Sequence, residues 1–509
     1  MSITEGLGSL LVGKPAEATA IAAIGRRPAT YGDLRALVER TRASLRAAGI
    51  GRADRVAIVL PNGPEMATSF VAVASAATSA PLNPGYKADE LDFYLSDLDA
   101  RALVLPRGMA GPAREVAERK GIPILALDVD ADAPAGLFRL SLENGAAAAT
   151  RSDGPLEGED IALVLHTSGT TARPKIVPLT IANLCASAGN IHASLALTPD
   201  DVCLNVMPLF HIHGLVAAVL ATLDAGATVT CTPGFDALKF FGWLESVRPT
   251  WYTAVPTMHQ AILARAARNE AIAKMSRLRF IRSSSASLPP QVMRELGQTF
   301  GCPVIEAYGM TEASHQMASN PLPPRAQKAG SVGLPAGPEI AIMDESGAIL
   351  PGGEEGEVVI RGRNVTHGYL GAPEANAKAF THGWFRTGDR GRLDADGYLH
   401  LTGRIKELIN RGGEKVSPLE VDAVLMDHPA VAQVVTFGVP HPKLGEEVAA
   451  AVVLREGKTV TERELKELAS SRLASFKVPR TIVFVSEIPK GATGKLQRIG
   501  LAERLGIVS

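Results

Sequence analysis

Apolar runs of strand length alternate with longer amphipathic segments up to about residue 330, and this alternation constrains the fold most strongly. The segment 31–48 carries apolar residues at helical spacing and stops at Gly49, and the run 55–60 then has the pattern of a buried strand. Strands that are joined by long helices form parallel sheets covered by helices. The same succession predicts helices over 65–77, 88–95, 180–197 and 215–223, and strands over 102–105, 161–165, 202–206, 228–231, 251–255, 278–281 and 304–307. The sequence therefore predicts an α/β protein with helix-covered, mostly parallel sheets.

The pattern changes near Gly333. Strand-like runs at 340–343, 356–361 and 398–401 are separated by Gly, Pro and Asp turns without helices between them, which predicts a small β-barrel-like antiparallel part. Beyond Gly403 the segments 418–426 and 461–473 are predicted helices, and 432–437, 448–454 and 481–485 are predicted strands. We expect a large N-terminal domain over residues 1–403 and a small, mobile α+β C-terminal domain over residues 404–509. The segment 134–159 is expected to be a surface connection.

Length and charge exclude several classes of protein. A chain of 509 residues is expected to form two or more domains. Its net charge of -1 produces no field that would attract nucleic acid. The N-terminus lacks the basic and apolar regions of a signal peptide, and Ser and Thr interrupt the most apolar stretch, 70–82. We expect a cytoplasmic protein that binds small molecules, with no nucleic-acid partner and no membrane span.

A loop rich in hydroxyl groups runs from His166 to Lys175, directly after the predicted strand 161–165. Such a loop can turn backbone N–H groups and hydroxyls toward one concave surface, and Lys175 adds a positive charge. These are the properties of a phosphate-binding loop, although the glycine spacing differs from that of the Walker A motif. A polar surface loop is the alternative for this stretch taken alone.

Two later stretches have side chains suited to the rest of a nucleotide. After a predicted strand, Tyr308 can stack on a base, Gly309 permits close backbone approach and Glu312 can hold Mg²⁺. A capped strand end is the alternative there. Asp389 follows a glycine turn and can accept hydrogen bonds from a ribose diol, or it can form an Asx turn.

Two further stretches indicate a moving domain. Residues 403–415 combine charges and paired glycines at the predicted domain boundary, which suggests a hinge; a solvated charged turn is the alternative. Residues 489–495 form a Gly/Thr loop that presents Lys495 near the C-terminus. This lysine can act at a distant nucleotide if the small domain closes over the site. A solvated surface lysine is the alternative.

Taken together and in this order, the motifs resemble the adenylate-forming acyl-CoA synthetase/luciferase superfamily from roughly residue 20 to 498. The resemblance rests on T-S-G-T-T-x-x-P-K at 167–175, Y-G-M-T-E at 308–312, T-G-D at 387–389, G-R-x-K-E at 403–407 and P-K-x-x-x-G-K at 489–495. It implies that a carboxylate attacks the α-phosphate of ATP to give an acyl-adenylate and pyrophosphate, and that the thiol of CoA then displaces AMP. Mg²⁺ is the implied cofactor, and catalysis relies on positioning and electrostatics.

The resemblance also assigns a role to each motif residue. For the phosphates, the adenine and the ribose these are Thr167, Ser168, Gly169, Thr170, Thr171 and Lys175, then Tyr308 and Gly309, and then Asp389 and Arg404. Thr311 and Lys495 are implied to approach the α-phosphate, and Glu312 is implied to bind Mg²⁺. Lys406 falls at the hinge position, and Gly412 and Gly413 are implied to line the pantetheine path.

The segments 207–214, 251–257, 282–288 and 405–415 resemble most closely the oxalate–CoA ligases of plants and fungi. The segments around the implied acyl pocket are unusually polar. An apolar acid would leave their polar groups without hydrogen bonds, which costs about 1–3 kcal/mol for each buried group. A small dianion instead needs donors around its second carboxylate. We therefore predict oxalate, with Ser285 and His315 at the second carboxylate and His211 at the reacting end. Malonate is the alternative acid.

Three further points concern His213, Arg282 and the class of enzyme. His211 and His213 form an H-x-H pair, but no third ligand lies at the spacing of a zinc site, so we expect His211 beside the acyl pocket instead. Strand alternation places Arg282 on the side of Leu278 and Phe280, which we expect to be core. An adenylating module that loads a carrier protein is the alternative of another class, but the chain has no G-x-[DH]-S-[LI] segment.

Overall fold

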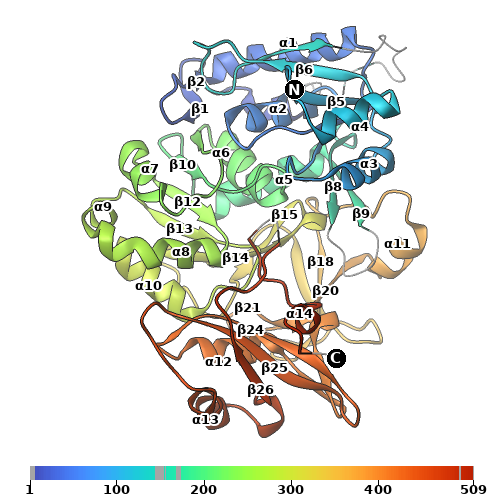
Figure 1. Cartoon of the computed structure of the whole chain (residues 1–509). Helices are drawn as coiled ribbons and strands as arrows, with labels where there is room; N and C mark the ends of the chain where they lie inside the picture. The colour runs from blue at the N-terminus through green and yellow to red at the C-terminus, as the bar shows by residue number, and fades with distance from the viewer. Residues whose placement is uncertain (1–5, 144–153, 155, 168–173, 492–493, 508–509) are drawn as a thin grey trace.

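The computed structural model describes residues 6–143, 154, 156–167, 174–491 and 494–507. Within these residues the chain forms four β-sheets; Figure 1 shows β5 and β6 of the seven-stranded sheet near the top and the most C-terminal sheet, with β24 to β26, at the bottom. The predicted α/β class, with a small antiparallel part and a C-terminal α+β part, is confirmed. None of the described helices is both long and apolar enough to cross a membrane.

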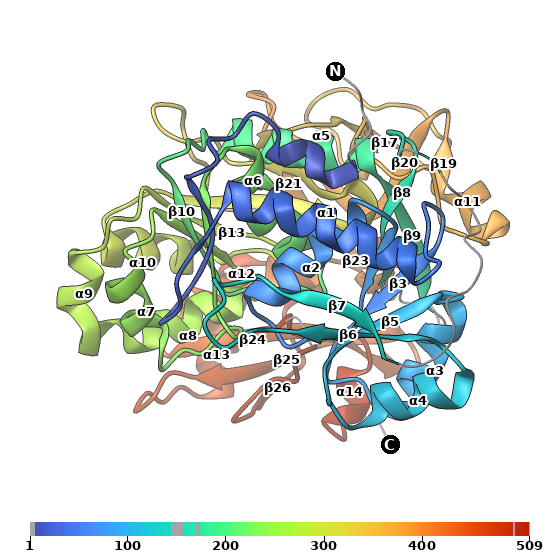
Figure 2. The ribbon, with the colours of Figure 1, turned by 90° about the horizontal axis from the view of Figure 1, so that it is seen from above.

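The first sheet has seven strands in the order β7-β6-β5-β3-β4-β8-β9 and is parallel except at its two edges. Its strands are β3 (Arg55–Ile58), β4 (Thr78–Pro81), β5 (Ala102–Pro106), β6 (Ile124–Asp128), β7 (Arg139–Leu142), β8 (Ile161–Thr167) and β9 (Lys175–Thr180). The helices of this part are η1 (Gly6–Leu11), α1 (Tyr31–Ala47), α2 (Pro64–Ala74), α3 (Ala88–Asp97) and α4 (Pro112–Lys120). Helix α1 begins at a capping box in which Thr30 and Asp33 bond each other's backbone N–H groups, and it lies beside α2 (Figure 2).

The second sheet has nine strands in the order β16-β15-β14-β13-β12-β10-β11-β1-β2. Its strands are β1 (Thr19–Ala23), β2 (Ala29–Thr30), β10 (Val202–Asn205), β11 (Thr228–Cys231), β12 (Trp251–Ala254), β13 (Phe280–Ser283), β14 (Val304–Met310), β15 (His315–Ser319) and β16 (Leu334–Pro335). The helices are α5 (Ile181–Ser194), the π-helix η2 (His213–Leu220), α6 (Ala221–Asp224), α7 (Phe240–Val247), α8 (Pro256–Ala266), η3 (Ala267–Asn269), α9 (Glu270–Lys274), α10 (Pro290–Phe300) and η4 (Thr311–Ala313). Strands β10, β12, β13 and β14 run parallel, so their carboxyl ends meet at one edge, where ligands bind in open α/β sheets.

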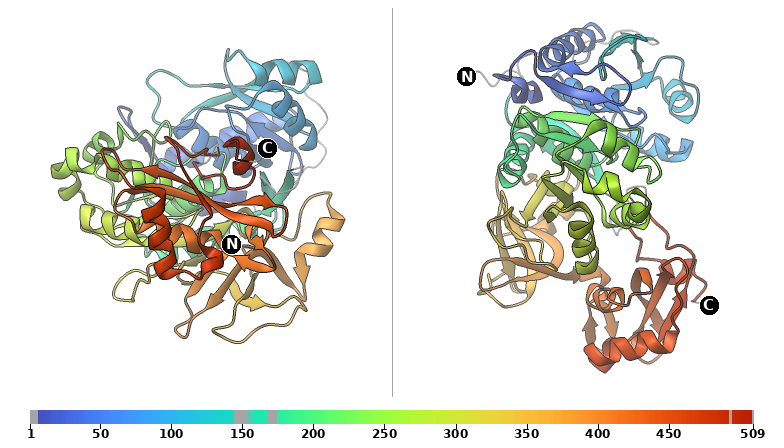
Figure 3. Two further views of the ribbon diagram at one scale, coloured as in Figure 1. Left: turned by 60° about the horizontal axis from the view of Figure 1, so that its bottom comes forward. Right: turned by 90° about the vertical axis from the view of Figure 1, so that its left-hand side faces the viewer.

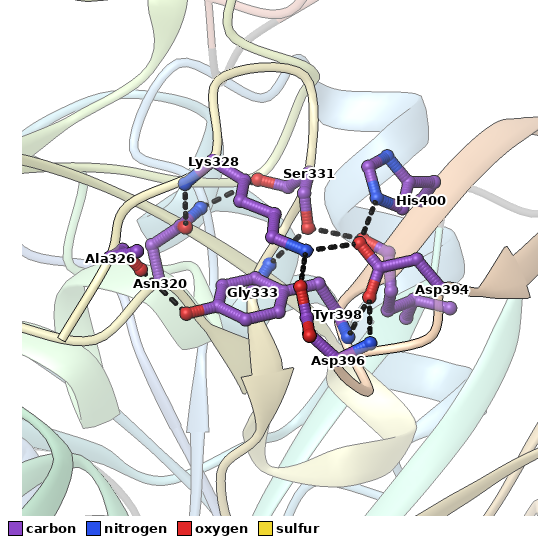
Figure 4. A network of polar contacts seen from close by, with 10 residues as sticks. Asn320, Ala326, Lys328, Ser331, Gly333, Asp394, Asp396, Tyr398 and His400 are labelled. Atoms are coloured by element: carbon purple, nitrogen blue, oxygen red, sulfur yellow. Dashed lines mark hydrogen bonds and ion pairs between the residues drawn. The ribbon is translucent and has the colours of Figure 1, made fainter.

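The third sheet is antiparallel, as predicted, and contains β17 (Glu339–Met343), β18 (Gly356–Arg361), β19 (Phe380–Thr381), β20 (Trp384–Leu393) and β21 (Leu399–Arg404), with α11 (Pro373–Ala379) beside it. A polar network ties the segment after β15 to the turn between β20 and β21 (Figure 4). The ammonium group of Lys328 lies 2.6 Å from Asp394 and 2.7 Å from Asp396, and the hydroxyl of Tyr398 donates to the carbonyl oxygen of Ala326 at 2.6 Å. These contacts join the third sheet to the second.

The fourth sheet, with its helices, forms the part of the chain from residue 409 to 507, which we call the lid. It contains β22 (Ile409–Arg411), β23 (Glu414–Val416), β24 (Val431–His441), β25 (Gly445–Leu454) and β26 (Thr481–Phe484), with α12 (Pro418–Met426), α13 (Glu462–Arg472), η6 (Ser475–Lys477) and α14 (Leu501–Arg504). The short helix η5 (Ile405–Glu407), which contains Lys406, connects the lid to β21. In a side view the lid lies below the other sheets (Figure 3), and it contacts the helices of the second sheet through the ion pair of Arg455 with Glu295 at 3.0 Å.

Three local predictions differ from the structure in their bounds or type. The strand expected at 278–281 is β13, two residues further on, because backbone pairing with β12 starts at Phe280 opposite Trp251. The helix expected at 215–223 begins at His213 as a π-helix. Part of the expected connection 134–159 forms the edge strand β7, where Leu140 is buried between exposed neighbours.

Candidate active site

His213 is held in the protein interior by the π-helix η2. A side chain on the next residue, Gly214, would approach the carbonyl oxygen of Pro208 to 2.4 Å, so glycine is needed for η2 to begin this close to the preceding turn. Ser285 Oγ lies 2.9 Å from the His213 Nδ1 atom, and Thr253 Oγ1 lies 2.6 Å from its Nε2 atom. Both ring nitrogens are therefore engaged by hydroxyl groups, which leaves neither for a metal.

Arg282 lies beside Thr253, because β12 and β13 pair in register at these residues. Its side chain is completely buried, and its guanidinium donates to Thr253 Oγ1 at 3.3 Å and to Gln316 Oε1 at 3.2 Å. Burial lowers the pKa of Arg282 to about 9, which is still above neutral pH, so the group stays charged. The expectation of an apolar core position is thus corrected: Arg282 shares the face of Phe280, but this face becomes polar at the end of the strand.

Ser285 and His315 adopt backbone conformations that are rare for residues with side chains. Their φ angles are 76° and 99°, and Ser314 has a φ of 50°. Such left-handed backbone is strained outside glycine and concentrates at functional sites. The ring of His315 lies 4.9 Å from that of His213, centroid to centroid. The predicted substrate residues Ser285 and His315 therefore both lie against His213.

The histidines of this cluster are neutral when no ligand is bound. Burial lowers the pKa values of His213 and His315 well below the ordinary value, and the charges of Arg282 and Lys495 lower them further. Burial and the charge of Lys495 also lower the pKa of His211 to about 3. The cluster thus presents neutral rings, hydroxyl groups and positive charges. A bound carboxylate would act in the opposite direction and favour protonation.

Lys495 reaches the same region from the other end of the chain, on the segment that rises from the lid into the middle of the molecule (Figure 1). The backbone bonds Gly491 N–H to Lys495 O (2.8 Å) and Gln497 N–H to Pro489 O (3.0 Å) shape this segment as a hairpin. The hydroxyl of Thr257, at the start of α8, donates to the carbonyl oxygen of Gly494 at 2.7 Å. The lid therefore delivers Lys495 to the carboxyl edge of the second sheet.

Opposing interactions with its surroundings act on the pKa of Lys495. Burial lowers its pKa to about 8, the nearby charge of Arg404 lowers it too, and the carboxylates of Asp389 and Glu312 oppose this shift. These interactions show that three other predicted site residues lie near Lys495. Lys495 also faces a cavity of about 870 Å³ whose lining includes Leu288, Glu306 and the lid residue Gly413.

Asp389 is the centre of the predicted ribose site. It is buried, accepts a hydrogen bond from the hydroxyl of Tyr308, and lies 3.1 Å from Nε of Arg404, its partner across β20 and β21. Burial raises the pKa of Asp389, and Arg404 opposes this effect. The structure thus brings Tyr308, Asp389 and Arg404 together, while their roles toward a nucleotide stay predictions.

Glu312 and Lys175 meet through Tyr369, a residue that the sequence patterns did not indicate. The hydroxyl of Tyr369 donates to Glu312 Oε1 at 2.9 Å, and the ammonium of Lys175 lies 4.4 Å from the centre of the Tyr369 ring. Burial raises the pKa of Glu312. Lys175 pairs with Thr167 across β8 and β9, so both ends of the predicted phosphate loop are placed.

The remaining predicted residues either lie outside the described part of the chain or make no contact that tests their roles. Ser168, Gly169, Thr170 and Thr171 lie outside the described residues. Thr311 begins η4, and Gly309 lies in β14 against His315. Gly412 and Gly413 form the turn between β22 and β23, where the N–H of Gly412 donates to the carbonyl of Leu444 at 2.7 Å.

Sequence patterns also missed Thr253, Gln316 and the part that His213 and Arg282 play. Thr253, Arg282 and Gln316 lie in short strands and His213 starts η2; alternation can give the side of a strand on which a residue lies, but not its partners distant in sequence. A usable signal in the sequence is a histidine, His213, at the start of an otherwise apolar helical stretch.

Comparison with protein families matches residues 12–370 to the AMP-binding enzyme family and residues 420–495 to the AMP-binding enzyme C-terminal domain. The chain belongs to the AMP-binding enzyme family. It is 48% identical over 484 residues to an oxalate–CoA ligase of Arabidopsis thaliana, covering 94% of each chain. It is 42% identical over 475 residues to an oxalate–CoA ligase of Saccharomyces cerevisiae, covering 89% of this chain and 87% of the yeast protein. The structure of ATP-bound MatB from Rhodopseudomonas palustris superposes with a TM-score of 0.87 at 31% identity, covering 98% of both chains.

These matches confirm the resemblance drawn from the motifs. In this AMP-binding enzyme the chemistry of Glu312 fits Mg²⁺, because a hard cation prefers carboxylate oxygen. No group of three or more His, Cys, Asp and Glu side chains suited to a metal occurs in the described parts of the chain. Mg²⁺ would therefore be held by Glu312 together with phosphate oxygens and water, as is usual for this ion at nucleotide sites.

Proposed function

We propose that the protein ligates oxalate to coenzyme A at the expense of ATP, through an oxalyl-adenylate, and releases AMP and pyrophosphate. The relatives described above support the reaction, since two oxalate–CoA ligases match nearly the whole chain. The observation that carries the choice of acid is the buried cluster around His213. In it, hydroxyls, neutral rings and a guanidinium without a carboxylate partner among the described residues replace the apolar lining that a fatty or aromatic acid needs.

The acid lies between Lys495 and this cluster. Its reacting carboxylate faces Lys495 and His211, and its second carboxylate faces Ser285 and His315. Malonate has the same two charges but one more methylene, so it is the second candidate acid. An apolar acid would leave the donors of the cluster without acceptors, which costs about 1–3 kcal/mol for each buried group.

The nucleotide lies along the carboxyl edge of the second sheet. Tyr308 and Gly309 flank the adenine, Asp389 and Arg404 hold the ribose, and Thr311 approaches the α-phosphate. Thr167, the loop 168–171 and Lys175 hold the outer phosphates. Lys495 stabilises the charge that develops on the α-phosphate as the carboxylate attacks, which is electrostatic catalysis by a positioned cation.

The second step requires the lid to turn. The N-terminal domain ends at residue 403 and the C-terminal domain begins at 404. Lys406 in η5, between β21 and the lid, is the hinge. Rotation withdraws Lys495 and brings Gly412 and Gly413 toward the site, where they border the path of the thiol. The position of Lys406, in a short helix between the third and fourth sheets, supports this arrangement.

Steady-state kinetics over a panel of acids tests the proposal. The expected order of kcat/KM is oxalate, then malonate, then acetate and longer monoacids, measured by AMP release with CoA present. His315→Ala should reduce kcat/KM for oxalate far more than for acetate, because only oxalate has a second carboxylate. The choice of acid is wrong if a medium-chain or aromatic acid exceeds oxalate by about tenfold, or 1.4 kcal/mol. Transfer to a carrier protein in preference to CoA would favour the carrier-loading alternative.

A further inference from the structure

Arg282 carries a charge that the described protein does not neutralise. Its guanidinium is completely buried, and its two hydrogen-bonding partners, Thr253 and Gln316, are neutral. Its Nε–H group has no hydrogen-bond partner among the residues that the structure describes. Burying an unpaired charge is unfavourable, so a position like this one is normally balanced by an acid or by a ligand.

The contacts of Arg282 fix the direction of a chain of hydrogen bonds. A guanidinium has only donors, so Thr253 Oγ1 must accept from it. The Thr253 oxygen could also accept from Nε2 of His213, 2.6 Å away, but the threonine proton would then have no acceptor among the described residues, so this proton points to Nε2. His213 is neutral, so with Nε2 accepting it carries its proton on Nδ1 and donates to Ser285 Oγ at 2.9 Å. Ser285 consequently accepts from the ring, and its own proton is free for another group.

The side-chain amide of Gln316 also has a fixed orientation, with its oxygen toward Arg282. Its Nε2 atom donates to the carbonyl oxygen of Ala336 at 3.1 Å and to Ser194 Oγ at 2.9 Å. A carbonyl can only accept, so the amide nitrogen must face Ala336 and the amide oxygen must face Arg282. The amide cannot be turned round without losing both contacts.

We propose that Arg282, Thr253 and His213 form a polarised relay that makes Ser285 present its hydroxyl proton to the second carboxylate of the acid. The proposal rests on the proposed function and deepens it, because it names the groups that select a dianion. Arg282, Thr253 and His213 are positioning residues, whereas Ser285 touches the substrate. The left-handed backbone of Ser285, with a φ of 76°, holds its hydroxyl at the end of this relay.

The direction of the relay decides which acids are accepted. With the proton on Nε2 of His213, the proton of Ser285 would bond Nδ1, and the serine would offer only lone pairs, which repel a carboxylate. With the direction that Arg282 imposes, the serine is a donor. A monoacid such as acetate has a methyl group where the dianion has its second carboxylate. Its binding therefore depends less on whether Ser285 donates a hydrogen bond.

Thr253→Val and Thr253→Ser are a matched pair for the test, since valine has nearly the shape of threonine without the hydroxyl, and serine keeps the hydroxyl. Thr253→Val should lower kcat/KM for oxalate by about 10- to 100-fold, the usual range for a lost hydrogen bond to a charged group. Its kcat/KM for acetate should change less than about threefold. Thr253→Ser should retain most of the preference for oxalate over acetate.

A spectroscopic readout separates the relay from a merely structural effect. Nitrogen NMR of protein labelled with ¹⁵N-histidine reports which ring nitrogen carries the proton, and the His213 signals are assigned by their loss in His213→Gln. The wild type and Thr253→Ser should show His213 protonated on Nδ1. Thr253→Val should move the proton to Nε2, and Arg282→Met, which removes the orienting donor, should give a mixture.

The outcomes distinguish the relay from the proposed function. If the wild type does not activate oxalate while His213 is protonated on Nδ1, the choice of acid fails and the relay stands. If the wild type activates oxalate but Thr253→Val keeps the oxalate-to-acetate ratio, the relay is refuted. Wild-type His213 protonated on Nε2 would refute it as well, whatever the kinetics, and this reading needs no active variant.

Discussion

Gly309 supports the geometry of His315, and replacing it tests how much that geometry contributes. An added Cβ at this position would lie 1.8 Å from the carbonyl oxygen of His315, 2.6 Å from its carbonyl carbon and 3.0 Å from its Nδ1 atom. The close approach arises where β14 and β15 pair with a β-bulge between Tyr308 and Gly309. Gly309→Ala therefore pushes directly on the backbone of a predicted substrate residue.

The size of the effect follows from these distances. Restoring an ordinary van der Waals contact of at least 3.4 Å from the present 1.8 Å requires the carbonyl oxygen of His315 to retreat by about 1.6 Å. Overpacking of this kind destabilises a fold by about 1–3 kcal/mol. A displacement of about 1 Å at a positioned group costs on the order of 10²-fold in rate. We expect Gly309→Ala to lower kcat/KM for oxalate by about 10²-fold and to stay folded.

The assay is pyrophosphate release with oxalate and with acetate, together with thermal unfolding. Gly242→Ala is the matched control, because Gly242 lies in helix α7 with nothing near its added Cβ. That variant should keep full activity and gain about 0.5–1 kcal/mol of stability from the higher helix propensity of alanine. Gly309→Ala with wild-type kinetics for both acids would show that the position of His315 does not control the reaction.

Three other predictions concern Lys495 and the hinge residue Lys406. Lys495→Ala should slow adenylation by about 10²–10³-fold while thioester formation from pre-made acyl-adenylate stays nearly intact, and equal losses in both half-reactions would contradict this role. Since burial lowers the pKa of Lys495 to about 8 and the charged form is the active one, kcat/KM for ATP in adenylation should fall as pH rises through about 8; Lys495→Arg, which keeps its charge, should remove this decline. Lys406→Pro, which fixes φ near roughly -65°, should leave pyrophosphate release largely active and block CoA capture, and loss of adenylation alone would argue against a hinge.

The layout of the fold could be predicted because its causes are local. Alternating strands and helices of sufficient length dictate helix-covered parallel sheets, and the loss of helices after Gly333 dictates the antiparallel part. Strand ends could not be predicted as well, since an apolar run marks burial but not the residue where pairing begins. The two-residue shift of β13 is an example, and it is also what puts Arg282 and Ser283 inside the sheet.

The residues of the candidate site could likewise be predicted only in part. Asp389 and Arg404 could be predicted because each belongs to a motif of the family resemblance, and the structure makes them partners across β20 and β21. Thr253, Arg282 and Gln316 come from different strands and meet only through sheet register and the turn after β14. Strand alternation gave the correct side for Arg282, but whether that side is apolar or polar at its end depends on partners distant in sequence.

The unpaired charge of Arg282 also has a consequence for how the protein withstands unfolding. In the free enzyme the native state bears the desolvation of a cation that has no carboxylate partner among the described residues, whereas the unfolded chain leaves the same cation in water. A dianion that binds only the native state relieves this imbalance and shifts the unfolding equilibrium by mass action. The midpoint of thermal unfolding should therefore rise with oxalate concentration, and the substrate acts as a stabiliser of its own enzyme.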